Sequence, residues 1–168
     1  HLEAPDMETY SKALNGGQYP LSVLAVNERA ANVYAKGTYG NTMTTNPRAM
    51  DIATNVLNSL TPEIRANIRG KGQEALDKRN VLKAELGGLI TKVQGTGLLF
   101  SCELDPSFKC YGANSTEEYM RERGIGVIHG GTNSLRFTPH FGITSPEMDL
   151  MISHIRLALL NGPRKQEA

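Results

Sequence analysis

Three stretches of this chain carry the same helix-start signal, a small polar residue followed directly by proline. They are Asn46-Pro47, Thr61-Pro62 and Ser145-Pro146. A polar side chain at such a position accepts the free N–H groups of a first helical turn, and proline has no N–H to leave unpaired there. We therefore expect helices over residues 46 to about 60, 61 to about 86, and 145 to the stop at Gly162-Pro163.

Short apolar runs separate these helices and indicate strands. The runs cover residues 90–93, 97–104, 127–128 and 134–137, and a fourth helix is expected over 115–123. Within the second run, Leu98, Phe100 and Cys102 alternate with other residues and should face a core, although Leu99 interrupts a clean pattern. The last helix places apolar residues on one face at helical spacing: Met148, Met151, Ile152, Ile155 and Leu159.

The order of these elements predicts an α/β fold. From Asn46 onward it is helix, helix, two strands, helix, two strands, helix, which can bury a small sheet under helices as one compact unit over residues 46–168. Residues 1–45 offer only one strand (21–26), one helix (28–35) and two loops. We expect them to be the incomplete end of a larger domain whose upstream part precedes this sequence.

Composition excludes several classes of function. The 168 residues are 39% hydrophobic and 21% charged, which is typical of a globular protein. A net charge of +1 gives no reason to expect nucleic acid or a membrane as partner. The start of the chain is polar and lacks a signal peptide, so we expect a cytoplasmic protein. The histidines and the two cysteines, Cys102 and Cys110, have no metal-ligand spacing, and a disulfide between them is disfavoured.

Lys12 is the residue with the clearest potential for chemistry. It ends a short segment and is followed by Gly16-Gly17 and Pro20. A glycine pair gives the backbone conformations closed to other residues, so this lysine can be held at the wall of a site. An amine held in this way can form a Schiff base with a carbonyl group. A lysine in such a turn is otherwise an ordinary surface charge.

Three segments, in order, resemble the C-terminal part of the class III aminotransferases. They are Ser11-Lys12-Ala13-Leu14-Asn15-Gly16-Gly17-Gln18-Tyr19-Pro20, residues 39–47 (Tyr39-Gly40-Asn41-Thr42-Met43-Thr44-Thr45-Asn46-Pro47) and residues 133–139 (Asn133-Ser134-Leu135-Arg136-Phe137-Thr138-Pro139). Residues 94–100 lie between the last two and fit the same pattern. The resemblance runs from Pro5 to about Leu160. The family, of ornithine, acetylornithine and other ω-amino transaminases, has the fold type I architecture and uses pyridoxal 5'-phosphate.

The resemblance implies roles for four residues. Lys12 would carry the cofactor as a Schiff base and move the proton during catalysis. Thr42 would hydrogen-bond the cofactor phosphate across the interface of a homodimer, with Asn41 beside it in the same loop. Arg136 would bind the substrate carboxylate, for which the fork of a guanidinium is suited. The implied reaction moves an amino group from an amino acid to a keto acid or aldehyde.

The chain departs from the family pattern at two places. Thr44 and Thr45 stand where the family often has two glycines, which predicts a stiffer phosphate loop. Thr138-Pro139-His140 follows Arg136-Phe137 where paired prolines are usual, and this could reshape the substrate pocket.

Two other functions remain open from the sequence. The same fold supports aminomutases and decarboxylases, and a stand-alone α/β module could serve assembly without catalysis. The family's ring-stacking aromatic residue, its acidic partner for the pyridine nitrogen and its glycine-rich phosphate loop all precede the lysine. Residues 1–12 are too few to supply them, so we expect this chain alone to be inactive and to need the upstream half of the enzyme.

Overall fold

The computed structural model describes residues 3–38, 40, 42 and 44–165. The chain forms two compact units, His1–Thr61 and Pro62–Ala168, each described here by itself. We predicted a domain boundary between residues 45 and 46. The two compact units divide after Thr61, beyond the helix over residues 47–59, because that helix packs within the first unit.

A two-stranded antiparallel hairpin forms the centre of the first unit. Strand β1 (Met7–Ser11) pairs with β2 (Ser22–Val26), with Met7 opposite Val26 and Ser11 opposite Ser22. The sequence predicted β2 and missed β1. Residues 7–11 lack a regular alternation of apolar and polar residues, so their strand conformation depends on pairing with β2.

Three short helices complete the first unit: η1 (Lys12–Asn15, a 3₁₀ turn), α1 (Glu28–Ala31) and α2 (Pro47–Ser59). As predicted, Asn46 caps α2, since its side chain accepts a hydrogen bond from the N–H of Arg48 at 3.0 Å. Helix α2 packs against η1. Helix α1 ends at Ala31 rather than at Ala35, because the N–H groups of Val33 and Tyr34 bond three residues back in tighter turns.

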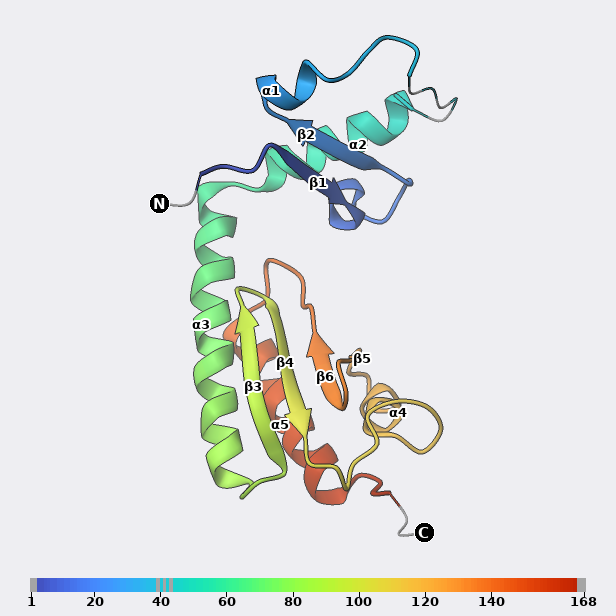
Figure 1. The fold of residues 1–168 in the computed structure, drawn as a ribbon. Helices are drawn as coiled ribbons and strands as arrows, with labels where there is room; N and C mark the ends of the chain where they lie inside the picture. The colour runs from blue at the N-terminus through green and yellow to red at the C-terminus, as the bar shows by residue number, and fades with distance from the viewer. Residues whose placement is uncertain (1–2, 39, 41, 43, 166–168) are drawn as a thin grey trace. The chain divides into compact units, whose positions relative to one another are not determined.

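The second unit contains a four-stranded antiparallel sheet with the strand order β3-β4-β6-β5 (Figure 1). The strands are β3 (Ile90–Thr96), β4 (Leu99–Leu104), β5 (Ile128–Gly130) and β6 (Ser134–Phe137). β6 lies between β4 and β5, with Ser101 opposite Arg136 on one side and Ile128 opposite Arg136 on the other. This register fixes the position of Arg136 in the sheet.

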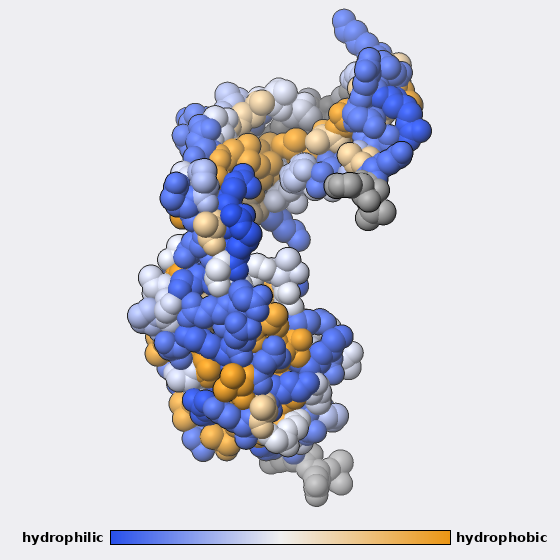
Figure 2. All heavy atoms as spheres, turned by 90° about the vertical axis from the view of Figure 1, so that its left-hand side faces the viewer, coloured by the Kyte–Doolittle hydropathy of each residue, from blue (hydrophilic) through white to orange (hydrophobic). Residues whose placement is uncertain are grey.

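Helices α3 (Pro62–Glu85), α4 (Thr116–Arg121) and α5 (Ser145–Asn161) complete this mixed α/β unit. Helix α3 packs against β3, β4 and α5, and α4 packs against α5. The side of the unit that α3 forms is largely hydrophilic, as Figure 2 shows. Within the described residues, no helix has both the length and the apolar character needed to cross a bilayer.

The core of the second unit confirms the apolar patterns read from the sequence. Leu98, Phe100 and Cys102 are buried, and Leu99 is exposed. The predicted face of α5 is buried along its whole length: Met148, Met151, Ile152, Ile155 and Leu159. The sheet and the helices therefore bury the apolar faces that the two periodicities predicted.

Among the described residues, two buried side chains are charged, Arg79 and Glu117. Arg79 of α3 is 1% exposed and donates hydrogen bonds to the carbonyl oxygens of Ala75 (2.8 Å), Gln94 (3.3 Å) and Ser101 (3.1 Å). Its guanidinium carbon lies 4.0 Å from the centroid of the Phe100 ring. A guanidinium that is fully hydrogen-bonded and stacked on an aromatic ring can stay buried. Arg79 thereby ties α3 to both strands of the β3–β4 hairpin.

Both cysteines are buried free thiols. Burial raises the pKa of Cys110 to about 12 and also raises the pKa of Cys102, next to Arg79. A thiol with a raised pKa carries little thiolate at neutral pH. The two cysteines therefore serve as small core residues.

Candidate functional site

Lys12 lies where β1 ends and η1 begins, in a left-handed backbone conformation with a φ of 56°. This conformation is uncommon for a residue with a Cβ atom and costs about 1–2 kcal/mol. The side chain is exposed, and across the ranges that the structure describes no carboxylate forms an ion pair with its amine. Lys12 therefore presents, at a bend of the chain, an amine that is in no ion pair with the described carboxylates.

The turn after Lys12 is organised by Asn15 and two glycines. Gly16 and Gly17 have φ values of 58° and 74°, which confirms the conformations expected of the glycine pair. Asn15 is buried, and its side-chain oxygen accepts a hydrogen bond from the N–H of Gly17 at 2.8 Å. The sequence reading missed Asn15. An asparagine just before glycines is a known turn signal that could have identified it.

The residues of the implied phosphate loop are only partly described. Thr42 lies exposed in a turn, and Asn41 lies outside the described residues. Thr45, which replaces a family glycine, has a φ of 60°. A β-branched residue in this region is a strong outlier, so the chain keeps here a backbone conformation that glycine would adopt without strain.

Arg136 of β6 is exposed and lines a pocket of about 390 Å³ in the second unit. The wall of this pocket is mostly apolar and includes Val127, Phe137 and Met151. Thr138 and Pro139, which replace the usual paired prolines, also line it. A guanidinium beside an apolar wall suits a ligand with a carboxylate on an alkyl chain.

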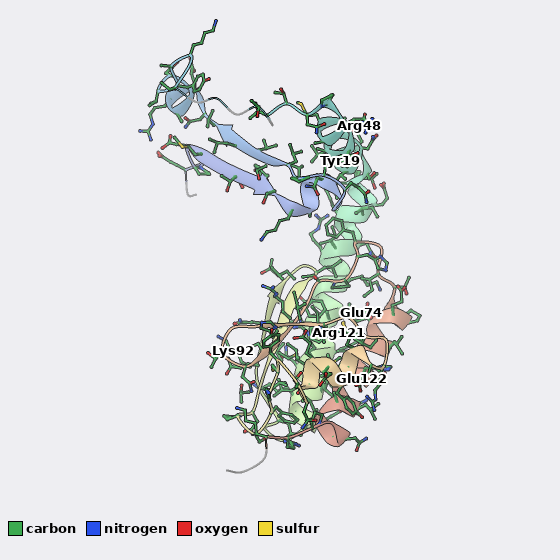
Figure 3. The ribbon with its side chains drawn as sticks, turned by 90° about the vertical axis from the view of Figure 1, so that its right-hand side faces the viewer. Tyr19, Arg48, Glu74, Lys92, Arg121 and Glu122 are labelled. Carbon is green, nitrogen blue, oxygen red and sulfur yellow. The ribbon has the colours of Figure 1, made fainter. Side chains whose placement is uncertain are left out.

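A second arginine, Arg121, is the last residue of α4 (Figure 3). It lines the same pocket. It forms an ion pair with Glu117, one turn earlier in the helix. The other oxygen of this carboxylate lies 3.1 Å from Nδ1 of His129, and the Glu117 side chain is only 7% exposed. The sequence reading passed over Arg121, because an arginine spaced four residues after a glutamate is usually a solvated helix pair.

The proposed site residues thus lie in both units. Lys12 and Thr42 belong to the first unit, whereas Arg136 belongs to the second. Among the described residues, no cluster of three or more histidine, cysteine, aspartate or glutamate side chains could hold a metal ion.

Comparison with known proteins gives the context for these residues. The family model for class-III aminotransferases matches residues 2–159. A succinylornithine transaminase of Citrobacter koseri is 30% identical over 155 residues, which are 92% of this chain and 37% of the relative. The chain therefore spans little more than a third of the length of this curated relative.

Solved structures agree in fold. An acetylornithine aminotransferase of Elizabethkingia anophelis matches with a TM-score of 0.82 and 26% identity, over 94% of this chain and 41% of that one. An ornithine aminotransferase of Toxoplasma gondii matches with a TM-score of 0.78 and 28% identity, over 93% of this chain and 37% of that one. That structure is described as having partial occupancy of PLP at its active site. This chain, whose matched region includes both Lys12 and Arg136, belongs to the class-III aminotransferase family.

Proposed function

We propose that this chain is the C-terminal portion of a pyridoxal-phosphate-dependent aminotransferase that moves an amino group from an amino acid to a keto acid or aldehyde. One observation carries the proposal. In a chain of this family, Lys12 holds an exposed amine with no ion-pair partner among the described residues, at a bend that costs conformational free energy. Strain of this kind is often found at functional sites.

The described residues suit the cofactor chemically. The amine of Lys12 would bind covalently to the cofactor aldehyde, and the hydroxyl of Thr42 would donate a hydrogen bond to its phosphate. Asn41, which precedes Thr42 in the sequence and lies outside the described residues, is the other residue proposed to bind the cofactor. When bound, pyridoxal phosphate supplies a conjugated ring that withdraws electrons from the α-carbon of the substrate.

In this proposal Lys12 also transfers the proton. Nζ of Lys12 would accept the proton from the substrate α-carbon and later return it. Gly16 and Gly17 follow Lys12 in the sequence and have left-handed backbone conformations in the turn after it. Arg136 orients the substrate by binding its carboxylate from the pocket in the second unit.

We also propose that residues 1–45 are the end of the large cofactor-binding domain and residues 46–168 the small C-terminal domain, and that the protein acts as a homodimer. Activity would require the sequence that the relatives carry outside the matched region, since this chain spans 37% of the first of them. Exposed apolar residues on the hairpin, including Val23, Leu24 and Val26, support a surface that packs against further protein.

We further propose a cytoplasmic location, which the free thiols of Cys102 and Cys110 support.

The test is chemical labelling of the full polypeptide that contains this chain. After addition of pyridoxal phosphate and reduction with borohydride, peptide mapping should find the phosphopyridoxyl group on Lys12. The Lys12→Ala variant should lose the label and lose aminotransferase activity by roughly a hundredfold or more. The matched control is Lys92→Ala, which removes an exposed lysine from β3.

Three results would contradict the proposal. Labelling at another lysine would exclude the role of Lys12 as the cofactor lysine. An unlabelled wild-type protein would favour an assembly module, while a labelled protein whose products are not those of amino transfer would favour an aminomutase or decarboxylase.

A further inference from the structure

The pocket around Arg136 contains a second guanidinium that the proposed reaction leaves without a role. Arg121 lines the pocket, and its side chain is 61% exposed even though it is paired with Glu117. A guanidinium has five N–H donors, and the pair with Glu117 leaves several of them available to a ligand. The exposed part of Arg121 is therefore able to bind an anion at this pocket.

Arg121 is held in place rather than free in solvent. The carboxylate of Glu117 is almost fully buried and lies between the guanidinium of Arg121 and the imidazole of His129. The His129 ring in turn packs against the Tyr111 ring, with 4.0 Å between their centroids. An arginine restrained in this way loses less side-chain entropy when it binds a ligand, because part of its freedom is already lost.

Charge balance favours an anionic ligand. Glu117 offsets one of the two positive charges, and within the part of the chain that the structure describes no carboxylate forms an ion pair with Arg136. The apolar residues of the wall, including Val127, Phe137 and Met151, suit methylene groups next to the charge. The ligand that fits both features is an aliphatic carboxylate.

We propose that Arg121 is a second carboxylate-binding residue of the Arg136 pocket, and that Glu117 is its positioning residue. The proposal goes beyond the proposed function in assigning a residue on α4 to substrate binding. It rests on that function only in treating the carboxylate as part of the substrate. The binding itself requires neither cofactor nor turnover, so it can be measured separately.

The experiment is a titration of the ¹⁵N-labelled chain with sodium propionate at constant ionic strength, with sodium chloride as the salt control. The arginine Nε–H signals are followed by NMR and assigned with the Arg121→Gln and Arg136→Gln variants. Arg121→Gln should weaken propionate binding roughly tenfold, the effect of losing a charge-assisted hydrogen bond. Saturable shifts of the Arg121 signal in the wild type are expected as well.

Arg123→Gln is the matched control for charge. Arg123 follows Arg121 closely, but its guanidinium stacks 3.5 Å from the centroid of the Tyr119 ring and does not line the pocket. This variant removes the same charge and should change propionate affinity less than about twofold, as expected of an exposed charge outside the site. Equal effects of Arg121→Gln and Arg123→Gln would overturn the proposal.

A double variant separates an effect on binding from an effect on folding. Arg121→Gln leaves the Glu117 carboxylate buried beside His129 alone, which could destabilise the unit. The double variant Glu117→Gln/Arg121→Gln removes that buried charge, so it should fold and still bind propionate weakly. Wild-type affinity in the folded double variant would also overturn the proposal.

The outcomes separate this inference from the proposed function. If Arg136→Gln leaves propionate binding unchanged while Arg121→Gln weakens it, the role proposed for Arg136 is wrong and that of Arg121 stands. If Lys12 is not labelled by the cofactor but both arginine variants lose affinity, the aminotransferase proposal fails and the carboxylate site remains.

Discussion

A Cβ atom built at Gly72 would lie 2.5 Å from the carbonyl oxygen of Gly97. Helix α3 and the turn between β3 and β4 thus approach each other more closely than any side chain allows. Helix propensity alone ranks Gly70 and Gly72 as equally unfavourable in the middle of this helix. The structure separates the two, because a Cβ at Gly70 would meet nothing within 4 Å.

This difference predicts opposite effects of the same substitution. Gly72→Ala should lower the free energy of unfolding of the second unit by about 2–3 kcal/mol, because the new methyl group collides with backbone atoms. Gly70→Ala should raise it by about 1 kcal/mol through better helix propensity. Urea denaturation followed by circular dichroism measures both, and equal effects of the two variants would contradict the close contact.

Lysine should not be able to replace Arg79 without loss of stability. Lysine has neither the fork that reaches the carbonyl oxygens of Gln94 and Ser101 nor a planar group to stack on Phe100. Arg79→Lys should therefore destabilise the second unit by about 2 kcal/mol. The control is Arg69→Lys at an exposed position of the same helix, which should change stability by less than about 0.5 kcal/mol. Denaturant midpoints of the two variants give the comparison.

The ion pairs of Glu74 should make the stability of the second unit depend on pH in the acid range. Hydrogen bonds from Lys71 and Lys78, both at 2.7 Å, lower the pKa of this carboxyl from 4.5 to about 2. Because the pKa is lower in the folded state, the stabilisation is complete above about pH 4.5 and is lost as the pH falls toward 2.

Glu74→Gln should therefore reduce stability at neutral pH and flatten the loss of stability between these two pH values. Thermal unfolding measured across that range gives the comparison. Glu122→Gln, at an exposed glutamate of the same unit (Figure 3), should leave the pH profile unchanged. A Glu74→Gln profile that coincides with that of the wild type would show that the pairs contribute nothing.

The backbone conformation at Lys12 predicts a difference in stability between two variants of this residue. Glycine adopts a φ of 56° without steric cost, whereas alanine does not. Lys12→Gly should thus be more stable than Lys12→Ala by about 1 kcal/mol, although both lack the amine. Hydrogen exchange of the β1–β2 amides reports the stability of this unit, and the reverse order would mean that the left-handed turn is not adopted.

How far the sequence predicted the fold depended on whether the signal was local. The helices that begin at Asn46-Pro47 and Thr61-Pro62 were predicted because caps and prolines act within one turn. At the last helix the signal was displaced by one residue: Thr144 is the N-cap, and its N–H donates to Glu147 at 2.8 Å. Strand β1 was missed because its hydrogen bonds come from β2, beyond an intervening turn.

The candidate site shows the same division. Lys12 and Arg136 could be proposed from the sequence, because their segments resemble those of a known family. Arg121 could not, since its place at the pocket depends on the ion pair with Glu117, whose buried carboxylate also contacts His129 of β5. Contacts between residues distant in the chain produce no local pattern from which a single sequence could predict them.

The strand order β3-β4-β6-β5 also governs when this unit can form during synthesis. The second partner of β4 is β6, so the β4 edge of the β3–β4 hairpin stays unpaired during synthesis until residues 134–137 have emerged. An unpaired strand edge is open to pairing with other chains. A polypeptide interrupted before β6 would therefore expose the β4 edge to pairing with other chains.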